Sequence, residues 1–276
     1  MQELIDGLAE NLKDGKETET NKEIERLAPL LSLKQMHNAL EYFYSIWVKL
    51  LKKETDYNKM QVVQNLCIAR GEDICPYLDK TAFGDDSCIQ GYAIDILCKM
   101  AATKGTRKQK TLELINENLD DFYYETLMPT MYSLGYFENE PLVEEMFKRQ
   151  LEQIKGSYID FITMLKPCVW NYKKIVKGYM PLLKTIILES DEKDYSLFEM
   201  AYIMKSKNGE EMKAYDEKGN EFTAEEGIEA NKLSAAAIFF EVEKYDPQVN
   251  AFIAEVAQNS KFESHKKCAE SLLAKN

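Results

Sequence analysis

Residues 87–119 read SCIQGYAIDILCKMAATKGTRKQKTLELINENL, and their apolar pattern decides the predicted fold. Apolar side chains recur at steps of three and four residues between Ile89 and Met100, which is the period of a helix with one buried face. A turn sequence follows around Gly105, and the same step returns in residues 112–119. This stretch therefore predicts two helices joined by a short turn.

Segments of the same design begin near Ser87, Phe122 and Ser157, at intervals of 35 residues. In the second segment, Gly135 breaks the helical pattern and Pro141 lies where a new helix would begin. A helix pair of this length cannot bury both faces alone, so neighbouring pairs should stack. We predict a mainly α fold, an α-solenoid of stacked antiparallel helix pairs. A non-repetitive helical bundle remains the alternative, because its amphipathic helices would show the same steps.

In helix-pair spacing and apolar pattern, residues 34–188 resemble the HEAT and armadillo group of α-helical repeats. The resemblance lies in the architecture and not in a diagnostic motif. Tetratricopeptide repeats have a similar period, but their W-x-x-L-G-x-x-Y motif is absent from all three segments. The resemblance implies a HEAT-like scaffold with an extended surface for a partner.

Four regions are predicted along the chain, packed as one continuous elongated domain. Residues 1–33 should contain a helix from Gln2 to Lys13 and then a loop. Residues 34–205 form the helical-repeat region, residues 206–224 a β-hairpin insertion, and residues 225–276 the C-terminal helices.

Local signals mark the ends of several elements. The helix over residues 58–70 should end at Gly71, and Asp246-Pro247 should begin a helix near the C-terminus. Another helix is predicted over residues 195–205. Thr223 stands three residues before a glutamate, in the spacing of a capping box, so a helix should begin there.

A small β-hairpin is predicted near residues 212–223. Its turn is the segment Asp216-Glu217-Lys218-Gly219-Asn220, which is rich in turn-forming residues. The strands would be residues 212–215 and 221–223.

Composition limits the class of protein. The chain has 276 residues, is 45% hydrophobic and carries a net charge of −12, so it can bury a core and is not disordered as a whole. With 12 glycines and 7 prolines, it has too few turn-forming residues for an all-β fold. Residues 1–6 include acids where a secretory signal needs bases, and no run of 18 apolar residues occurs. We expect a cytoplasmic protein that does not enter a membrane.

The sequence shows no recognisable catalytic or metal-binding constellation. No phosphate-binding glycine motif and no C-x-x-C occur, and the histidines His37 and His265 lack ligand-type partners at site-like intervals. We therefore predict no metal and no cofactor. The non-catalytic interpretation is favoured, and the question of enzymatic activity is left open. Six cysteines are expected to be reduced and mostly in the core: Cys67, Cys75, Cys88, Cys98, Cys168 and Cys268.

Charges alternate in blocks along the chain. Residues 99–110 carry a net charge of +5, residues 111–147 of −9, residues 148–187 of +6 and residues 189–229 of −8. The blocks either form patches that steer a partner of opposite charge or neutralise one another between neighbouring repeats. The second interpretation is favoured for most of the charges. Adjacent carboxylates are read as helix caps or solvated faces, namely Asp85-Asp86, Asp120-Asp121 and Glu144-Glu145.

A candidate binding surface combines aromatic residues with bases, because such a cluster can stack on a nucleic-acid base or anchor in a protein pocket. Its predicted members are Trp170, Tyr172, Lys173, Lys174, Lys177, Lys104, Arg107 and Lys108. A core position for Trp170 is the competing interpretation.

Two functional hypotheses follow. The first is a non-catalytic protein–protein interaction scaffold of unknown partner, with an immunity- or antitoxin-like binder of a basic protein as one form. The second is a DNA-binding protein similar to the HEAT-like DNA glycosylases. The net negative charge disfavours nucleic acid as a partner, and neither Trp47 nor Trp170 has an aspartate one helical turn later.

Overall fold

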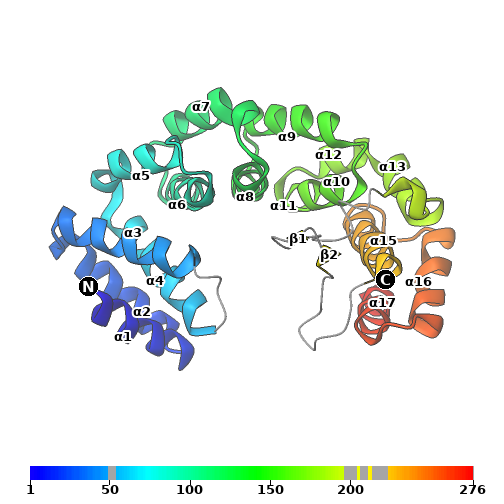
Figure 1. The fold of residues 1–276 in the computed structure, drawn as a ribbon, viewed down its shortest axis with the longest axis horizontal. Coiled ribbons are helices and arrows are strands. Elements are labelled where there is room, and N and C mark those ends of the chain that lie inside the picture. The colour runs from blue at the N-terminus through cyan, green and yellow to red at the C-terminus, as the bar shows by residue number, and fades with distance from the viewer. Residues whose placement is uncertain (49–53, 196–203, 206–210, 213–222, 276) are drawn as a thin grey trace. The chain divides into compact units, whose positions relative to one another are not determined.

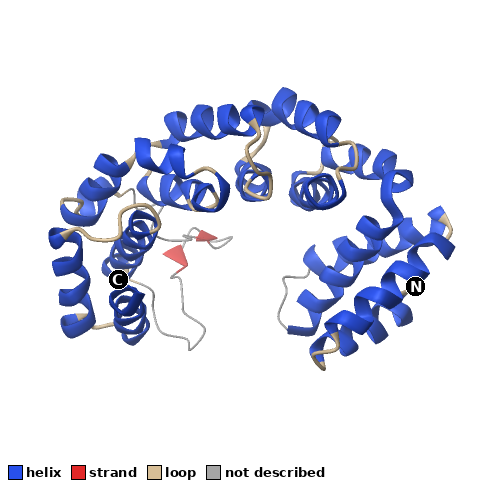
Figure 2. Ribbon diagram, turned by 180° about the vertical axis from the view of Figure 1, so that it is seen from behind, coloured by secondary structure: helices blue, strands red, loops and turns tan. Residues whose placement is uncertain are grey.

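The computed structural model describes residues 1–48, 54–195, 204–205, 211–212 and 223–275 (Figure 1). Helices form nearly all of the described chain, and the strands are a single short pair (Figure 2). The prediction of a mainly α fold is confirmed.

The elements of the first half are α1 (Gln2–Lys13), α2 (Glu17–Leu27), η1 (Ala28–Leu30), α3 (Leu33–Val48), α4 (Glu54–Arg70), η2 (Gly71–Ile74), α5 (Cys75–Ala82), α6 (Ser87–Lys104), α7 (Lys108–Asn118), η3 (Leu119–Asp121) and α8 (Tyr124–Leu134). Those of the second half are α9 (Pro141–Ile154), α10 (Tyr158–Leu165), α11 (Cys168–Asn171), α12 (Lys173–Gly178), α13 (Met180–Leu188), η4 (Glu192–Asp194), β1 (Met204–Lys205), β2 (Glu211–Met212), α15 (Ala224–Phe240), α16 (Pro247–Asn259) and α17 (Glu263–Lys275). Elements labelled η are 3-10 helices.

The chain forms two compact units, unit 1 (Met1–Phe137) and unit 2 (Glu138–Asn276). The division lies between α8 and α9, and it does not coincide with the predicted region boundaries at residues 33, 205 and 224. The continuous elongated domain stays a prediction.

Helix α6 is the centre of unit 1, because it packs against α4, α5, α7 and α8. Contact on several sides explains why its apolar residues are buried almost without interruption from Ala93 to Ala101. Its axis approaches α8 closely at Gly91, where an added Cβ would lie 3.0 Å from Pro129 Cγ. Figure 1 shows the two helices side by side.

A polar network crosses this core at Asp95, whose side chain is 15% exposed. Its carboxylate accepts hydrogen bonds from Gln64 of α4 (2.8 Å), from Ser133 of α8 (2.7 Å) and from the Tyr136 hydroxyl (3.0 Å). Lys99, one turn later in α6, pairs with the same carboxylate at 2.9 Å. Burial, and then the Asp95 charge, raise the pKa of Tyr136, which keeps its hydroxyl protonated and able to donate. The network therefore ties α4, α6 and α8 together.

Helix α15 is the centre of unit 2, with α10, α13, α16 and α17 packed against it. Buried Asn231 of α15 accepts a hydrogen bond from the Tyr195 hydroxyl at 3.1 Å and donates to the Tyr158 carbonyl at 3.4 Å. An ion pair of 2.7 Å joins Lys184 of α13 to Asp246, the N-cap of α16. Polar contacts thus fix the helices around α15.

Most predicted helix ends are observed. Helix α1 has the predicted bounds, and α4 ends before Gly71, whose φ of +79° lies in the left-handed region that glycine favours. Pro141 begins α9, and Asp246 accepts hydrogen bonds from two backbone amides of α16. Thr223 accepts one from the Glu226 amide at the start of α15.

The loop predicted after Lys13 is wrong, because residues 17–27 form helix α2. This helix is rich in charged residues, and few of its side chains are buried, among them Thr20 and Ile24. Thr20, Ile24 and Leu27 recur at helical steps, but Ile24 and Leu27 are the only apolar residues among many charged ones, so the segment resembles a polar loop in composition. Helices α6, α8 and α10 begin close to the three predicted segment starts, whereas the stacking of helix pairs into a solenoid stays a prediction.

The predicted β-hairpin of residues 212–215 with 221–223 is not seen. Met212 instead pairs with Met204 in the two-residue antiparallel ladder of β1 and β2, and residues 213–222 lie outside the described part of the chain. The helix predicted over 195–205 is wrong at its end, because Met204 and Lys205 form β1. Two-residue strands are too short to show the alternating side-chain pattern by which a strand is recognised in a sequence, so this ladder could not be predicted.

None of the helices in the described ranges is long and apolar enough to cross a lipid bilayer.

Replacing the network carboxylate should destabilise unit 1. Asp95→Ala leaves Lys99 and Gln64 without their shared acceptor, and we expect it to lower the free energy of unfolding by about 3 kcal/mol. Hydrogen exchange of α4, α6 and α8 amides in the full chain measures this loss. The exposed control Glu117→Ala should stay within about 0.5 kcal/mol. Equal protection in both variants would contradict a structural role for Asp95.

The negative charge of Asp246 should stabilise unit 2 at neutral pH but not in strong acid. Lys184 is the main cause that lowers the pKa of the Asp246 carboxyl in the folded chain, so the stabilisation is present at neutral pH and is lost as pH falls through that lowered pKa. Asp246→Asn preserves an N-cap acceptor and removes the charge. We expect it to cost about 0.5–1 kcal/mol at pH 7 and nothing well below pH ~4, measured by urea unfolding. A cost independent of pH would exclude the charge as its source.

Candidate functional site

A polar pocket of about 360 Å³ lies in unit 1, where the loops after α5 and α7 meet the start of α8. We call it the acidic–aromatic pocket. It is lined by Phe83, Gly84, Asp85, Gln90, Asn118, Asp121, Phe122 and Tyr123.

Side-chain contacts hold the walls of this pocket. Gln90 of α6 donates a hydrogen bond to the Gly84 carbonyl and accepts one of 2.8 Å from Thr126 of α8. The Phe83 and Phe122 rings stack with 6.5 Å between centroids and 20° between planes. The Gln90 amide therefore joins the loop after α5 to α8, and the aromatic pair joins the two loops.

Carboxylates surround the opening of the pocket. Asp85 and Asp121 line it and are exposed, and three more exposed acids adjoin these two in sequence or lie in the first turn of α8: Asp86, Asp120 and Glu125. Carboxylates carry negative charge at neutral pH, so this opening attracts cations.

Tyrosine adds a second kind of contact. Tyr123 lines the pocket with 71% of its surface exposed, and the adjacent Tyr124 is 53% exposed. An aromatic face attracts ammonium and guanidinium groups, and carboxylates pair with them. The arrangement suits a cationic side chain, and no nucleophile or paired base among the lining residues suggests a reaction.

The sequence contains a pattern that could have predicted this pocket: pairs of acidic residues next to aromatic residues. Phe83-Gly84-Asp85-Asp86 and Asp120-Asp121-Phe122-Tyr123 each combine an acid pair with aromatic residues directly after a helix. Interpreting the acids as caps or solvated faces separated them from their aromatic neighbours.

The predicted binding residues of unit 1 differ in their accessibility. Arg107 pairs with Asp79 of α5 at 2.6 Å, and its side chain is only 10% exposed. Lys104 is exposed and Lys108 is half-buried. Arg107 therefore joins the α6–α7 turn to α5 and offers little surface to a partner.

The predicted residues of unit 2 lie together on the consecutive helices α11 and α12. Trp170 is 44% exposed, and Lys174 and Lys177 are exposed. Tyr172 is buried: its ring centroid lies 5.5 Å from that of Phe147, and burial raises its pKa to about 12.

Lys173 is exposed and lies within 3.6 Å of the Glu241 carboxylate. The accessible members of this group are thus Trp170 and the three lysines. The structure does not place them in one unit with Lys104, Arg107 and Lys108.

Ion pairs neutralise part of the basic blocks. Within unit 1, Lys99 meets Asp95. The pairs in unit 2 are Lys148–Glu144, Lys155–Glu152, Lys173–Glu241 and Lys184–Asp246. Charges within one unit therefore satisfy one another at many positions, which leaves less basic surface than the sequence blocks indicate.

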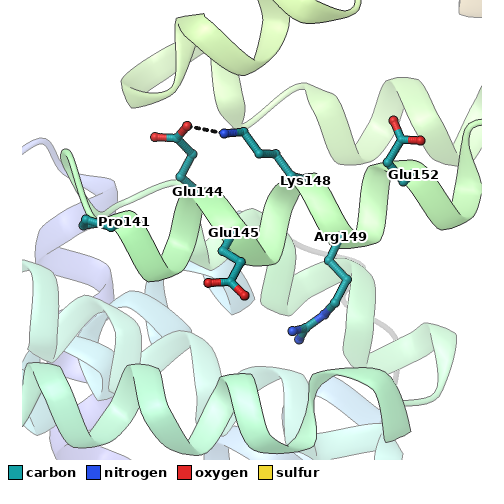
Figure 3. Close-up of a pocket in the computed structure, with 6 residues that line it drawn as sticks. All are labelled: Pro141, Glu144, Glu145, Lys148, Arg149 and Glu152. Atoms are coloured by element: carbon teal, nitrogen blue, oxygen red, sulfur yellow. Dashed lines mark hydrogen bonds and ion pairs between the residues drawn. The ribbon is translucent and has the colours of Figure 1, made fainter.

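A hollow of about 560 Å³ beside α9 is larger than the acidic–aromatic pocket, but it has a single wall. Glu144 and Lys148 point to one side of the helix and are joined by an ion pair, whereas Glu145 and Arg149 point to the other side (Figure 3). All of its lining residues come from α9, and their charges alternate. Such a surface favours neither sign of ligand.

One histidine and the buried cysteines occupy structural positions. The His37 ring stacks on Tyr77 with 4.0 Å between centroids. Four cysteines are buried, as predicted for core positions: Cys67, Cys75, Cys98 and Cys168. The described residues contain no group of three ligand side chains placed to hold a metal ion.

Comparison of the chain with known protein families, with curated proteins and with solved structures finds no match to any of them.

Proposed function

We propose that this protein is a non-catalytic protein–protein interaction scaffold whose acidic–aromatic pocket receives a cationic side chain of a basic partner. The observation that carries the proposal is that carboxylates and aromatic rings line one hollow: Asp85 and Asp121 share it with half-buried Phe122 and exposed Tyr123.

An arginine side chain fits this chemistry well. Its guanidinium can pair with one carboxylate in the plane of the group and lie against an aromatic ring with its face. Tyrosine offers a large contact area at a small cost in side-chain freedom, which is why it is enriched at interfaces. The net charge of −12 adds long-range attraction for a basic protein.

The scaffold part of the proposal rests on the helix order. Helices that begin near residues 87, 124 and 158 follow one another along the chain at a spacing of about 35 residues, and this order supports a HEAT-like α-solenoid. An immunity- or antitoxin-like protein that neutralises a cationic toxin is one form of this function. DNA binding is the competing hypothesis, and the ion pairs of the basic blocks weigh against it.

Removing charge from the acidic–aromatic pocket should weaken the binding of a cationic peptide. Asp85→Asn with Asp121→Asn preserves side-chain size and removes two charges from the lining. We expect the Kd of a labelled hexa-arginine peptide to rise about tenfold, measured by fluorescence anisotropy at low ionic strength. Tyr123→Ala should raise it about threefold.

The matched control removes two exposed charges elsewhere in unit 1. Glu3→Gln with Glu19→Gln changes the net charge by the same amount, in α1 and α2, and should alter the Kd by less than about twofold. If both double variants weaken the peptide equally, binding reflects net charge alone and the pocket is not the site.

The exposed lysines of α12 test the DNA hypothesis. Changing Lys173, Lys174 and Lys177 together to Glu should preserve helicity, because these side chains are exposed and the Lys173–Glu241 pair contributes less than about 1 kcal/mol. Circular dichroism measures this. Salt-dependent micromolar binding of duplex DNA that the triple variant loses would contradict the scaffold proposal.

A further inference from the structure

Unit 2 contains a second pocket, of about 360 Å³, that is mainly apolar. Helix α15 supplies Leu233, Ala237 and Ile238, and Val169 of α11 adds to the apolar wall. The volume lies in the range of small-ligand sites. Helix α17 contributes two chemically active side chains to the lining, His265 and Cys268.

His265 is held by a carboxylate from another helix. Its Nδ1 lies 2.7 Å from Glu229 Oε1 of α15, and Ser260 donates a hydrogen bond to the same oxygen. The residue is only 8% exposed, and the Phe262 ring lies 5.0 Å from its own ring. Glu229 therefore orients the imidazole with Nδ1 as the protonated nitrogen, which leaves Nε2 as a base.

The second ring nitrogen of His265 belongs to a pocket lining that also contains Lys166, Ser234 and Glu241. Among the described residues, no hydrogen-bond partner of His265 Nε2 is found, and the side chain lines the pocket. Cys268 follows three residues later on the same helix, so the Cβ atoms of the two residues lie about 5–6 Å apart on one face. A thiol, an imidazole and an orienting carboxylate thus meet at an apolar cavity.

Cys268 differs from the buried cysteines of the chain. Burial raises the pKa of Cys67 to about 12, and it also raises the pKa of Cys168, so these thiols are inert in the core. Cys268 is exposed and lies beside a base. Among the described cysteine side chains, Cys268 is the only exposed one, and it shares its pocket with an imidazole.

We propose that this pocket binds an apolar acyl group delivered as a thioester, and that Cys268 accepts it. His265 Nε2 takes the thiol proton, and the Cys268 Sγ attacks the carbonyl carbon to form a new carbon–sulfur bond. The carbon–sulfur bond to the donor thiol breaks, and the departing thiolate takes the proton from the imidazolium. Atoms and electrons balance as a thiol exchange, and no oxidant is needed.

The proposal is independent of the cationic-partner function, because it concerns a pocket in the other unit. Acylation would convert a water-accessible cavity into one filled by a covalently held chain. The apolar lining favours that chain over a polar thiol adduct, since the burial of apolar area stabilises it.

The experiment uses the full chain with octanoyl-coenzyme A at neutral pH. Intact mass measured over time should show one acyl addition, and peptide mapping should place it on Cys268, with Cys268→Ser unlabelled. His265→Gln should slow acylation about a hundredfold, because general-base assistance is lost. Acylation at other cysteines in preference to Cys268, or an equal rate in His265→Gln, would overturn the proposal.

A pocket-filling variant separates ligand binding from thiol reactivity. Ala237→Leu should slow octanoyl transfer about tenfold, while alkylation of Cys268 by iodoacetamide stays within about twofold, because only the acyl chain needs the cavity. Circular dichroism confirms that each variant is folded. If Ala237→Leu leaves the octanoyl rate unchanged, the cavity does not hold the acyl chain and the proposal is wrong.

Discussion

The close packing of α6 against α8 is the contact on which unit 1 depends. Three contacts follow one another along this interface: Gln90 with Thr126, Gly91 with Pro129, and Asp95 with Ser133. The glycine permits the close approach, and the polar groups on either side, which are buried or largely buried, then need hydrogen-bond partners within the protein. One register of the two helices satisfies all three contacts, so the packing is specific as well as apolar.

The candidate site follows from that interface. Gln90 uses the same amide to join α8 and the loop after α5, so the register of α6 and α8 also positions Phe83 and Asp85 against Phe122 and Tyr123. The carboxylates and aromatic rings of the two loops come to line one pocket only because the two helices pack in this way.

Unit 2 uses polar contacts between distant segments in a similar way. Asn231 joins α15 to Tyr195 and Tyr158, and Glu229, two residues earlier, meets His265 of α17. Asn231 thus holds segments of the core together, whereas Glu229 orients a side chain of the apolar cavity. Helix α15 is therefore both the structural centre of its unit and the wall of the proposed acyl site.

The sequence alone determined the helical class and most helix ends, because these depend on local features: apolar period, the left-handed Gly71, the proline that begins α9 and the side-chain caps at Thr223 and Asp246. Helix α2 was missed because its charged residues outnumber the two apolar residues that give it a helical period. The strand pair was missed because backbone pairing stabilises so short a ladder without a marked side-chain pattern. Only the tertiary structure decided which distant residues meet, such as Asp95 with Ser133 and Glu229 with His265. The two pairs are separated by 38 and 36 residues along the chain, where neither periodicity nor capping carries information about contact.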